Sequence, residues 1–457
     1  MLFAPLAYVL EFSFMSDAQF TSLLVLSTFL YVRGERTGLR KHTLGGSAVA
    51  ALAFLVRQQG VLIPIAVLTW LVLRRGLRPD KAGLRIAARV AGLPALVALA
   101  YLGWITFIHG IPAAQGNLFE EIGQAGWRSM ADVTVRMIFV EAMYVGIFVL
   151  PISAAAVVSA RRSRVSHSWR AWAVVAAWAS IIVFGLFVFV RLDQYMPYVP
   201  QFLTFWGLGP SDLHGGRPPI IGETLQQWLT AAAAASALVF GILLAHRFLG
   251  RPRAEQPQRR DGAGGMVLAV VVWQAVGAIP PSIHYRIPVP AAVEALSLDR
   301  YLLPLLPLVV CLALWGLGTW HGARLWPAWM VTAVFGVVAV AGTRDYLVFQ
   351  REVEVLASEL NRSGIPDARI DAGAQRNGQQ LHVNRPDIPP WQPNRTWWVN
   401  FFAPDTDPAY IISTKPEPGY EQVRSEPYSA WLSSSRNHLL VLRRSDEGAT
   451  APSDQPR

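Results

Sequence analysis

The sequence has little charge, almost no lysine and a single cysteine. Only 15% of its 457 residues are charged, whereas a soluble domain usually carries about 25%. Cys311 lies inside an apolar run, so no disulfide can form within the chain and cysteine gives no redox address. No basic leader precedes the apolar residues 1–10, so a cleavable signal peptide is not expected. The deficit of charge argues against an ordinary soluble protein and favours a lipid environment.

Apolar runs fill the first three quarters of the chain. A helix needs about 20 residues to cross the hydrocarbon core of a bilayer. The runs predict an all-α polytopic membrane region over residues 1–342, with about ten or eleven transmembrane helices. The candidate spans are 1–10, 18–32, 44–56, 60–73, 90–108, 136–159, 171–190, 227–246, 264–281, 301–320 and 325–342. The pair 44–56 and 60–73 could also form one long helix.

The basic residues indicate the orientation of these spans. Lysine and arginine are enriched in cytoplasmic loops. If 44–56 and 60–73 are two helices, twenty basic residues fall on one side and seven on the other. Fusing the pair would destroy this asymmetry, so two helices and a cytoplasmic position for the Arg-rich loops are predicted. Because the basic residues lie between apolar runs, nucleic acid is not expected as a partner.

The loops predicted outside the cytoplasm are long and rich in aromatic residues. They cover about 109–135, 191–226 and 282–300. Aromatic residues at this depth usually anchor a protein in the membrane interface. Segment 195–210 is denser in aromatic residues than anchoring requires. It is therefore a candidate for a re-entrant or interfacial segment that helps roof a cavity, and the alternative is plain anchoring.

The composition becomes that of a soluble protein from Thr343 onward. Residues 345–362 have apolar positions at helical spacing and end before Ser363-Gly364. Five strand-like runs follow, at 368–373, 396–402, 409–414, 420–424 and 438–444. We therefore predict a small extracytoplasmic α/β or α+β domain over 343–445 and a disordered tail over 446–457. This region contains no Walker loop, HExxH, GxSxG or CxxC pattern.

A few charged residues near the predicted membrane surface are not explained by lipid. Such residues are candidates for a functional site by default. Asp17 precedes span 18–32, where it is either a helix N-terminal acid or an acid in a cleft. Arg57 joins two short helices and either extends to the interface or binds a lipid phosphate. Asp299, Arg300 and Tyr301 precede a span that contains Pro304 and Pro307, and proline in a membrane helix often borders a cavity.

Four segments carry a resemblance to a known family. They are 13-SFMSDAQFTSLLVLSTFLYVRG-34, 52-LAFLVRQQGVLIP-64, 299-DRYLLPLLPLV-309 and 370-IDAGAQRNG-378. In this order and spacing they resemble the polyprenyl-phosphate-dependent membrane glycosyltransferases of the C-type fold, which include protein mannosyltransferases and the aminoarabinose transferases that modify lipid A. The third segment is the most specific of the four.

The resemblance implies an enzyme that transfers a sugar from a polyprenyl phosphate to a cell-envelope acceptor, which is a protein, a lipid or a glycan. A carboxylate would deprotonate the acceptor and cationic side chains would stabilise the leaving phosphate. Asp17 matches the family's second cavity acid and is the predicted catalytic residue. Arg57 and Arg300 match basic positions suited to the donor phosphate, and Asp299 and Tyr301 are predicted to help bind the substrate.

The composition indicates the location of the protein, and the resemblance bears on its cofactors. The excess of arginine over lysine suggests a high-GC bacterium, so we expect a multi-pass protein of the inner (plasma) membrane with its C-terminal domain outside the cytoplasm. Some relatives hold a divalent cation against cavity carboxylates and phosphate. A cation is therefore allowed, although the sequence has no dedicated cluster of ligands.

One departure from the family limits these expectations. The family's principal catalytic acid lies between its first two helices, and the matched segments place the start of this chain near the third or fourth helix. The expected base would then be missing. The alternative function is a multi-helix transporter or lipid flippase without glycosyl transfer, although no repeated span pattern supports it. A third hypothesis is a non-catalytic envelope scaffold.

Overall fold

The structure is a computed structural model, and it describes most of the chain. The described residues are 4–13, 15–110, 126–160, 168–249, 262–284, 299–318, 323–381, 392, 395–433 and 437–445. The predicted tail 446–457 and most of the predicted loops 109–135 and 282–300 lie outside them. The chain divides into two compact units, one of residues 1–200 and 223–337 and one of residues 201–222 and 338–457.

The first unit is helical. Its helices are α1 (Pro5–Glu11), α2 (Asp17–Thr37), α3 (Arg40–Val56), α4 (Leu62–Arg75), α5 (Lys81–Trp104), α7 (Trp127–Ala160), α8 (Trp169–Arg191), α9 (Glu223–Leu249), α10 (Gly262–His284) and α11 (Leu305–Leu317). Short helical turns are η1 (Gln58–Val61), η2 (Ile105–His109) and η3 (Asp299–Leu302). The long helix α12 (Trp326–Arg362) begins in this unit and continues into the second one.

Six helices in the described part of the chain are long and apolar enough to cross a membrane. They are Lys81–His109, Met130–Ser159, Trp169–Arg191, Glu223–Leu249, Gly262–Ile279 and Trp326–Arg362. Two further apolar helices, Gln58–Arg74 and Leu305–Leu317, are shorter. Every predicted span overlaps a helix, but the predicted count of ten or eleven membrane crossings is not confirmed. The structure thus has a largely helical unit with membrane-length apolar helices.

The chain breaks its helix at Arg57, as two separate spans require. Arg57 has an extended backbone (φ −147°, ψ 132°), and its N–H donates to the carbonyl of Ala53 at 2.8 Å. The turn is tight, because a Cβ on Gly60 would lie 2.3 Å from the backbone nitrogen of Phe54. Only glycine allows this approach, so α3 ends at Val56 and α4 starts at Leu62.

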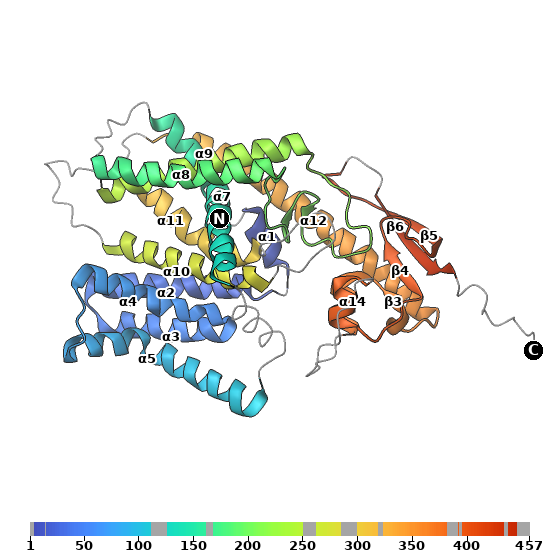
Figure 1. Cartoon of the computed structure of the whole chain (residues 1–457), viewed down its shortest axis with the longest axis horizontal. Coiled ribbons are helices and arrows are strands. Elements are labelled where there is room, and N and C mark those ends of the chain that lie inside the picture. The colour runs from blue at the N-terminus through green and yellow to red at the C-terminus, as the bar shows by residue number, and fades with distance from the viewer. Residues whose placement is uncertain are drawn as a thin grey trace, which may run out of the picture. The chain divides into compact units, whose positions relative to one another are not determined.

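Helices α2 to α5 and α10 enclose an apolar core. Helix α2 packs on α3, α3 on α5, and α4 on α10, and Figure 1 shows α2, α3, α4 and α5 running alongside one another. The fully buried side chains of this core include Phe20, Leu24 and Ile63. Tyr31 also belongs to this core, and its hydroxyl donates to the carbonyl of Val90 at 2.7 Å. This packing positions the start of α2 beside the α3–α4 turn.

The second unit is a four-stranded sheet covered by the C-terminal half of α12. The strands are β3 (Ile370–Asp371), β4 (Tyr410–Ser413), β5 (Tyr420–Tyr428) and β6 (Asn437–Arg444). Their order is β3-β4-β6-β5, with β3 parallel to β4 and the other pairs antiparallel. Phe349 and Leu356 of α12 pack with Ile412 and Leu439 of the sheet. The predicted small domain with a helix followed by strands therefore has a C-terminal sheet.

Two details of this unit differ from the prediction. Residues 396–402, predicted as a strand, form helix α14 (Trp397–Phe402). Trp398, Val399 and Phe402 share one helical face and pack with Ala374 of α13 (Gly373–Gln380), so tertiary packing overrides the strand preference of aromatic residues. The predicted boundary at 342/343 falls inside α12, which continues without a break to Arg362.

The loop between α8 and α9 is divided between the two units. Residues 201–222 belong to the second unit, where they form the small antiparallel hairpin of β1 (Leu203–Thr204) and β2 (Gly207–Leu208). In the first unit the Tyr198 ring packs against Phe139 of α7 and Phe189 of α8, with ring centroids 5.4 and 4.7 Å away. Tyr198 therefore packs within the protein rather than serving as a lipid anchor.

Candidate functional site

Four of the five predicted site residues meet in the helical unit. Asp17 is the first residue of α2, and Arg57 lies in the turn between α3 and η1. Arg300 and Tyr301 come from η3, which leads into α11. Three segments far apart in the sequence therefore contribute to one site. We refer to Asp17, Arg57, Arg300 and Tyr301 as the arginine cluster.

Asp17 and Arg57 form a buried ion pair. The distance from Arg57 Nη2 to Asp17 Oδ2 is 2.8 Å, and the side chains are 14% and 0% exposed. Arg57 Nε also donates to Ser16 Oγ at 3.1 Å. Within the described residues, Asp17 Oδ1 has no hydrogen-bond partner. Asp17 is thus more than an exposed acid at a helix N-terminus, because its carboxylate neutralises a buried guanidinium.

Tyr301 lies against both arginines. The guanidinium carbons of Arg57 and Arg300 are each 5.3 Å from the centroid of its ring. A cation over an aromatic face at this distance is attracted by the quadrupole of the ring. Arg300 also acts electrostatically on the Asp17 carboxylate. The ring therefore contacts two like charges, and the Asp17 carboxylate interacts electrostatically with both of them.

Arg300 has a different set of partners from Arg57. Its Nη1 donates to the Met15 sulfur at 3.0 Å. Its Nε is buried and has no hydrogen-bond partner among the described residues. A thioether is a weak acceptor, so this arrangement leaves much of the hydrogen-bonding capacity of the guanidinium unused.

Asp299, the fifth predicted residue, is fully buried next to the cluster in sequence. The Tyr144 phenol of α7 lies within its electrostatic reach. Among the described residues, no group of three or more His, Cys, Asp and Glu side chains is placed to hold a metal ion. Each guanidinium group of the arginine cluster carries a planar set of donors, which suits a phosphate or a carboxylate.

Sequence reasoning missed two residues of this site and one network elsewhere. Met15 and Ser16 directly precede Asp17, but neither residue type stands out in an apolar sequence. In the second unit, neither His214 nor Asp371 is among the predicted site residues. The structure joins these two side chains at the centre of a polar network.

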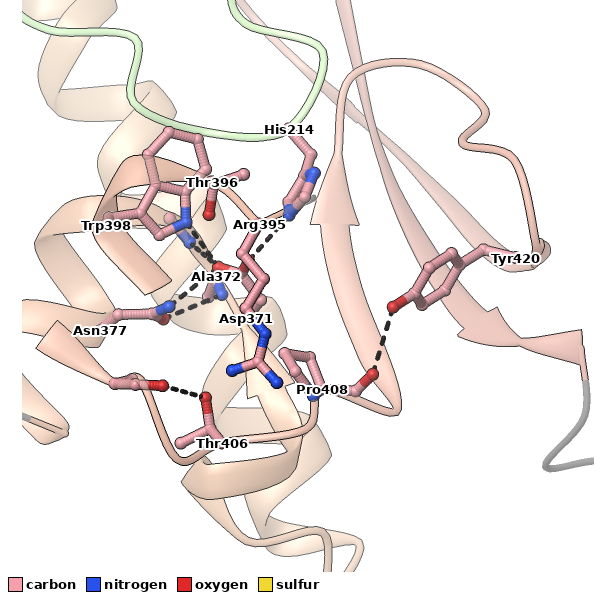
Figure 2. A network of polar contacts seen from close by, with 12 residues as sticks. His214, Asp371, Ala372, Asn377, Arg395, Thr396, Trp398, Thr406, Pro408 and Tyr420 are labelled. Carbon is pink, nitrogen blue, oxygen red and sulfur yellow. Dashed lines mark hydrogen bonds and ion pairs between the residues drawn. The ribbon is translucent and has the colours of Figure 1, made fainter. Parts of the chain in front are cut away.

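The polar network surrounds the Asp371 carboxylate (Figure 2). Oδ2 lies 2.7 Å from His214 Nε2, while Oδ1 accepts from Trp398 Nε1 at 2.8 Å and from Asn377 Nδ2 at 2.9 Å. The backbone N–H of Gly373 donates to Oδ1 at 3.1 Å. Asp371 is itself 2% exposed. The carboxylate thus ties together the end of β3, helices α13 and α14, and the loop that carries His214.

The backbone at position 373 requires glycine because it lies close to the loop that carries His214. Gly373 has φ +85°, and a Cβ there would lie 2.3 Å from the carbonyl oxygen of Asp212. That carbonyl accepts from the N–H of Ala374 at 2.9 Å, and the N–H of Thr414 donates to the carbonyl of His214 at 3.0 Å. Loop 201–222 is therefore held on the second unit by backbone contacts at Asp212 and at His214.

The His214 pKa is raised by its surroundings. Burial lowers it, but the hydrogen bond and negative charge of Asp371, aided by Glu417, outweigh burial and leave the pKa above its ordinary value. The ion pair therefore stabilises the fold fully below the unfolded-state pKa of about 6.5, and this stabilisation is lost as the pH rises through the higher folded-state pKa. On the same loop, burial raises the pKa of Asp212 to about 6.

Substitution of His214 by glutamine is expected to destabilise the second unit most at acidic pH. The difference in unfolding temperature between wild type and His214→Gln should shrink as the pH rises, because only the wild type loses a charge on His214. Thermal unfolding of the full chain, followed over a pH series, measures this difference. Asp212 titrates in both proteins and cancels in the comparison. His438→Gln, at an exposed position on β6, serves as the control, and a difference for His214→Gln that grows with pH would contradict the assignment.

Comparison of the chain with family models, with curated proteins and with solved structures finds no match. The functional assignment therefore rests on the residues of the arginine cluster and on the helices that hold them.

Proposed function

We propose that the chain is an integral membrane glycosyltransferase that passes a sugar from a polyprenyl phosphate to a cell-envelope acceptor. The observation that carries the proposal is the arginine cluster, in which two partly buried guanidinium groups contact one tyrosine ring and the buried Asp17 carboxylate pairs with one of them, in a unit of membrane-length apolar helices. A phosphate at the end of a long apolar chain suits both the cationic cluster and the apolar helices. Its chain dissolves in the bilayer, and its head group binds arginine.

In the proposed reaction, the acceptor hydroxyl oxygen attacks the anomeric carbon of the sugar. The bond from this carbon to the phosphate oxygen breaks, and its electron pair leaves with the polyprenyl phosphate. The phosphate gains a negative charge as the bond breaks, and the acceptor hydroxyl releases a proton to a base. Cationic groups aimed at the leaving oxygen stabilise this charge. Arg57 and Arg300, which both contact the Tyr301 ring, supply two such cations.

Asp17 is proposed to act mainly on Arg57. Its Oδ2 already pairs with Arg57 at 2.8 Å, and protonation of this oxygen would break the ion pair. We therefore propose that Asp17 positions Arg57 for the donor phosphate. Its role as the general base stays a prediction, which is supported by Oδ1, an atom with no hydrogen-bond partner among the described residues.

The proposal includes an orientation in the inner membrane of a bacterium. The Arg-rich loops would be cytoplasmic, and the α3–α4 turn with Arg57 would face the opposite side. Transfer would then occur at the outer face of the membrane, where the second unit would also lie. The alternative is a transporter or flippase for an anionic lipid, which the ion-paired state of Asp17 favours because such a protein needs the cations and no base.

The test is transfer of sugar from a lipid donor. Membranes containing the full chain are incubated with radiolabelled polyprenyl-phosphate mannose and with other polyprenyl-phosphate sugars, and label leaving the lipid is counted. Arg300→Ala should lower turnover by about 10²-fold or more, as expected for loss of a group that stabilises developing charge. Asp17→Ala should also lower turnover, because Arg57 loses the carboxylate that positions it.

Arg74→Ala is the matched control for this assay. Arg74 belongs to the same helical unit, pairs with Glu35 at 3.2 Å and lies over the Trp70 ring, yet it is more exposed and outside the arginine cluster. Its substitution should leave turnover nearly unchanged. Absence of turnover with every donor would refute glycosyl transfer and favour the transporter.

A further inference from the structure

We propose that Arg300 is the residue that captures the lipid phosphate, and that the Met15 thioether occupies its guanidinium until the phosphate replaces it. Arg57 would then contribute a fixed positive charge to the site without changing its own partners. This division of roles rests on the proposed function, since it concerns the phosphate of the same lipid donor. It predicts unequal effects for two arginines that look equivalent in the sequence.

Arg57 already has strong partners on two of its nitrogens. Nη2 pairs with the Asp17 carboxylate and Nε donates to Ser16 Oγ. Its backbone is fixed as well, because its N–H caps α3 through the Ala53 carbonyl. A ligand that used these nitrogens would have to break a buried ion pair, which is costly because Asp17 would be left buried without a counter-ion.

Arg300 has weak partners on the corresponding atoms. Within the described residues its Nη1 donates to a sulfur, and its buried Nε has no acceptor. Exchange of a thioether for a phosphate oxygen replaces a weak neutral acceptor by a charged one, which strengthens the hydrogen bond. Nε and Nη of one guanidinium can also bind two phosphate oxygens side by side. No existing ion pair has to break for this exchange.

Tyr301 stabilises the charge of Arg300, for which the described residues provide no salt bridge. The contact of its guanidinium with the ring, at 5.3 Å, stabilises the cation and leaves the in-plane N–H groups free to bond. The same ring contacts Arg57. A phosphate bound in the plane of the Arg300 guanidinium would therefore also feel the positive charge of Arg57. The Met15 thioether is a weak acceptor that a phosphate oxygen can replace at Arg300 Nη1.

The experiment measures binding of radiolabelled farnesyl phosphate to the full chain in lipid nanodiscs. Arg300→Gln should weaken binding by about 100-fold, the loss expected for a paired charge-assisted contact of roughly 3 kcal/mol. Met15→Leu removes the competing acceptor and should tighten binding about threefold. Met15→Gln supplies an amide oxygen, a stronger acceptor than sulfur, and should weaken binding several-fold. Arg74→Gln should bind as wild type does.

The Met15 pair keeps the test decisive if a charge substitution harms folding, because neither variant removes a charge. Equal binding by Met15→Leu and Met15→Gln, or full binding by Arg300→Gln, would overturn the proposal. Unlabelled inorganic phosphate and farnesol serve as competitors. If inorganic phosphate competes at the concentration at which farnesyl phosphate binds, the site is one for free phosphate. If neither inorganic phosphate nor farnesol competes at that concentration, binding requires the head group and the chain in one molecule.

Failure of this inference is distinguishable from failure of the proposed function. If wild type binds farnesyl phosphate with the predicted pattern but transfers no sugar, the Arg300 site stands and glycosyl transfer falls. If sugar is transferred but binding depends on Arg57 and ignores Met15 and Arg300, only the division of roles falls. If wild type binds no farnesyl phosphate at all, both fall.

Discussion

Replacement of Asp371 by alanine should destabilise the second unit by roughly 3–5 kcal/mol, the range found when one partner of a buried ion pair is removed. The substitution leaves the indole N–H of Trp398, the side-chain amide of Asn377 and the backbone N–H of Gly373 without their shared acceptor. It also removes the counter-ion of His214. Each buried donor left without a partner costs about 1–3 kcal/mol, so the loss is large for a single side chain.

Hydrogen exchange of residues 370–380 in the full chain measures this loss without requiring the helical unit to unfold. Asp407→Ala is the control, because Asp407 also pairs with an arginine, Arg444, but is 72% exposed. An exposed pair usually contributes about 1 kcal/mol or less. Asp371→Asn should fall between the two, since its amide oxygen keeps one acceptor. Equal exchange in Asp371→Ala and Asp407→Ala would show that the network is not important for stability.

The helices of this protein were predictable because their signal is local. An apolar run of sufficient length forms a helix whatever its neighbours are, so each predicted span overlaps a helix. The separation of α3 and α4 at Arg57 could also be predicted, from the distribution of charge. The number of membrane crossings could not, because hydropathy alone does not tell a short apolar helix such as α11 from a full span.

The second unit depends on contacts that no local pattern contains. His214 and Asp371 are 157 positions apart, so nothing near His214 in the sequence indicates that loop 201–222 belongs with the C-terminal sheet. The run Thr396–Phe402 has the aromatic composition of a strand, and only its packing against Ala374 makes it a helix. Tertiary contacts decide such cases, since strand propensity largely reflects the surface on which a residue packs.

The arginine cluster was predictable in part, for a physical reason. Charged residues are rare within apolar sequence, so Asp17, Arg57 and Arg300 stand out, and the structure brings them together with Tyr301. Met15 and Ser16 could not be distinguished, because a thioether and a hydroxyl are common in apolar helices. Their roles follow only from their distances to the two guanidinium groups.

The Asp17–Arg57 pair should show strong coupling in a double-mutant cycle. Asp17→Ala leaves Arg57 buried without its counter-ion, and Arg57→Ala leaves the fully buried Asp17 carboxylate alone, so each should cost about 3–5 kcal/mol. The double variant removes both charges and should be more stable than either single variant. Thermal unfolding of the full chain in detergent gives the three shifts relative to wild type.

The Arg74–Glu35 pair provides the matching cycle. It has the same chemistry in the same helical unit, but its side chains are 35% and 10% exposed, so its coupling should be below about 1 kcal/mol. Simple addition of the Asp17 and Arg57 effects would contradict the buried ion pair. Sugar transfer by the same variants then separates fold from function: if the double variant regains stability but stays inactive, the two charges are kept for the phosphate chemistry, because the helical unit folds without them.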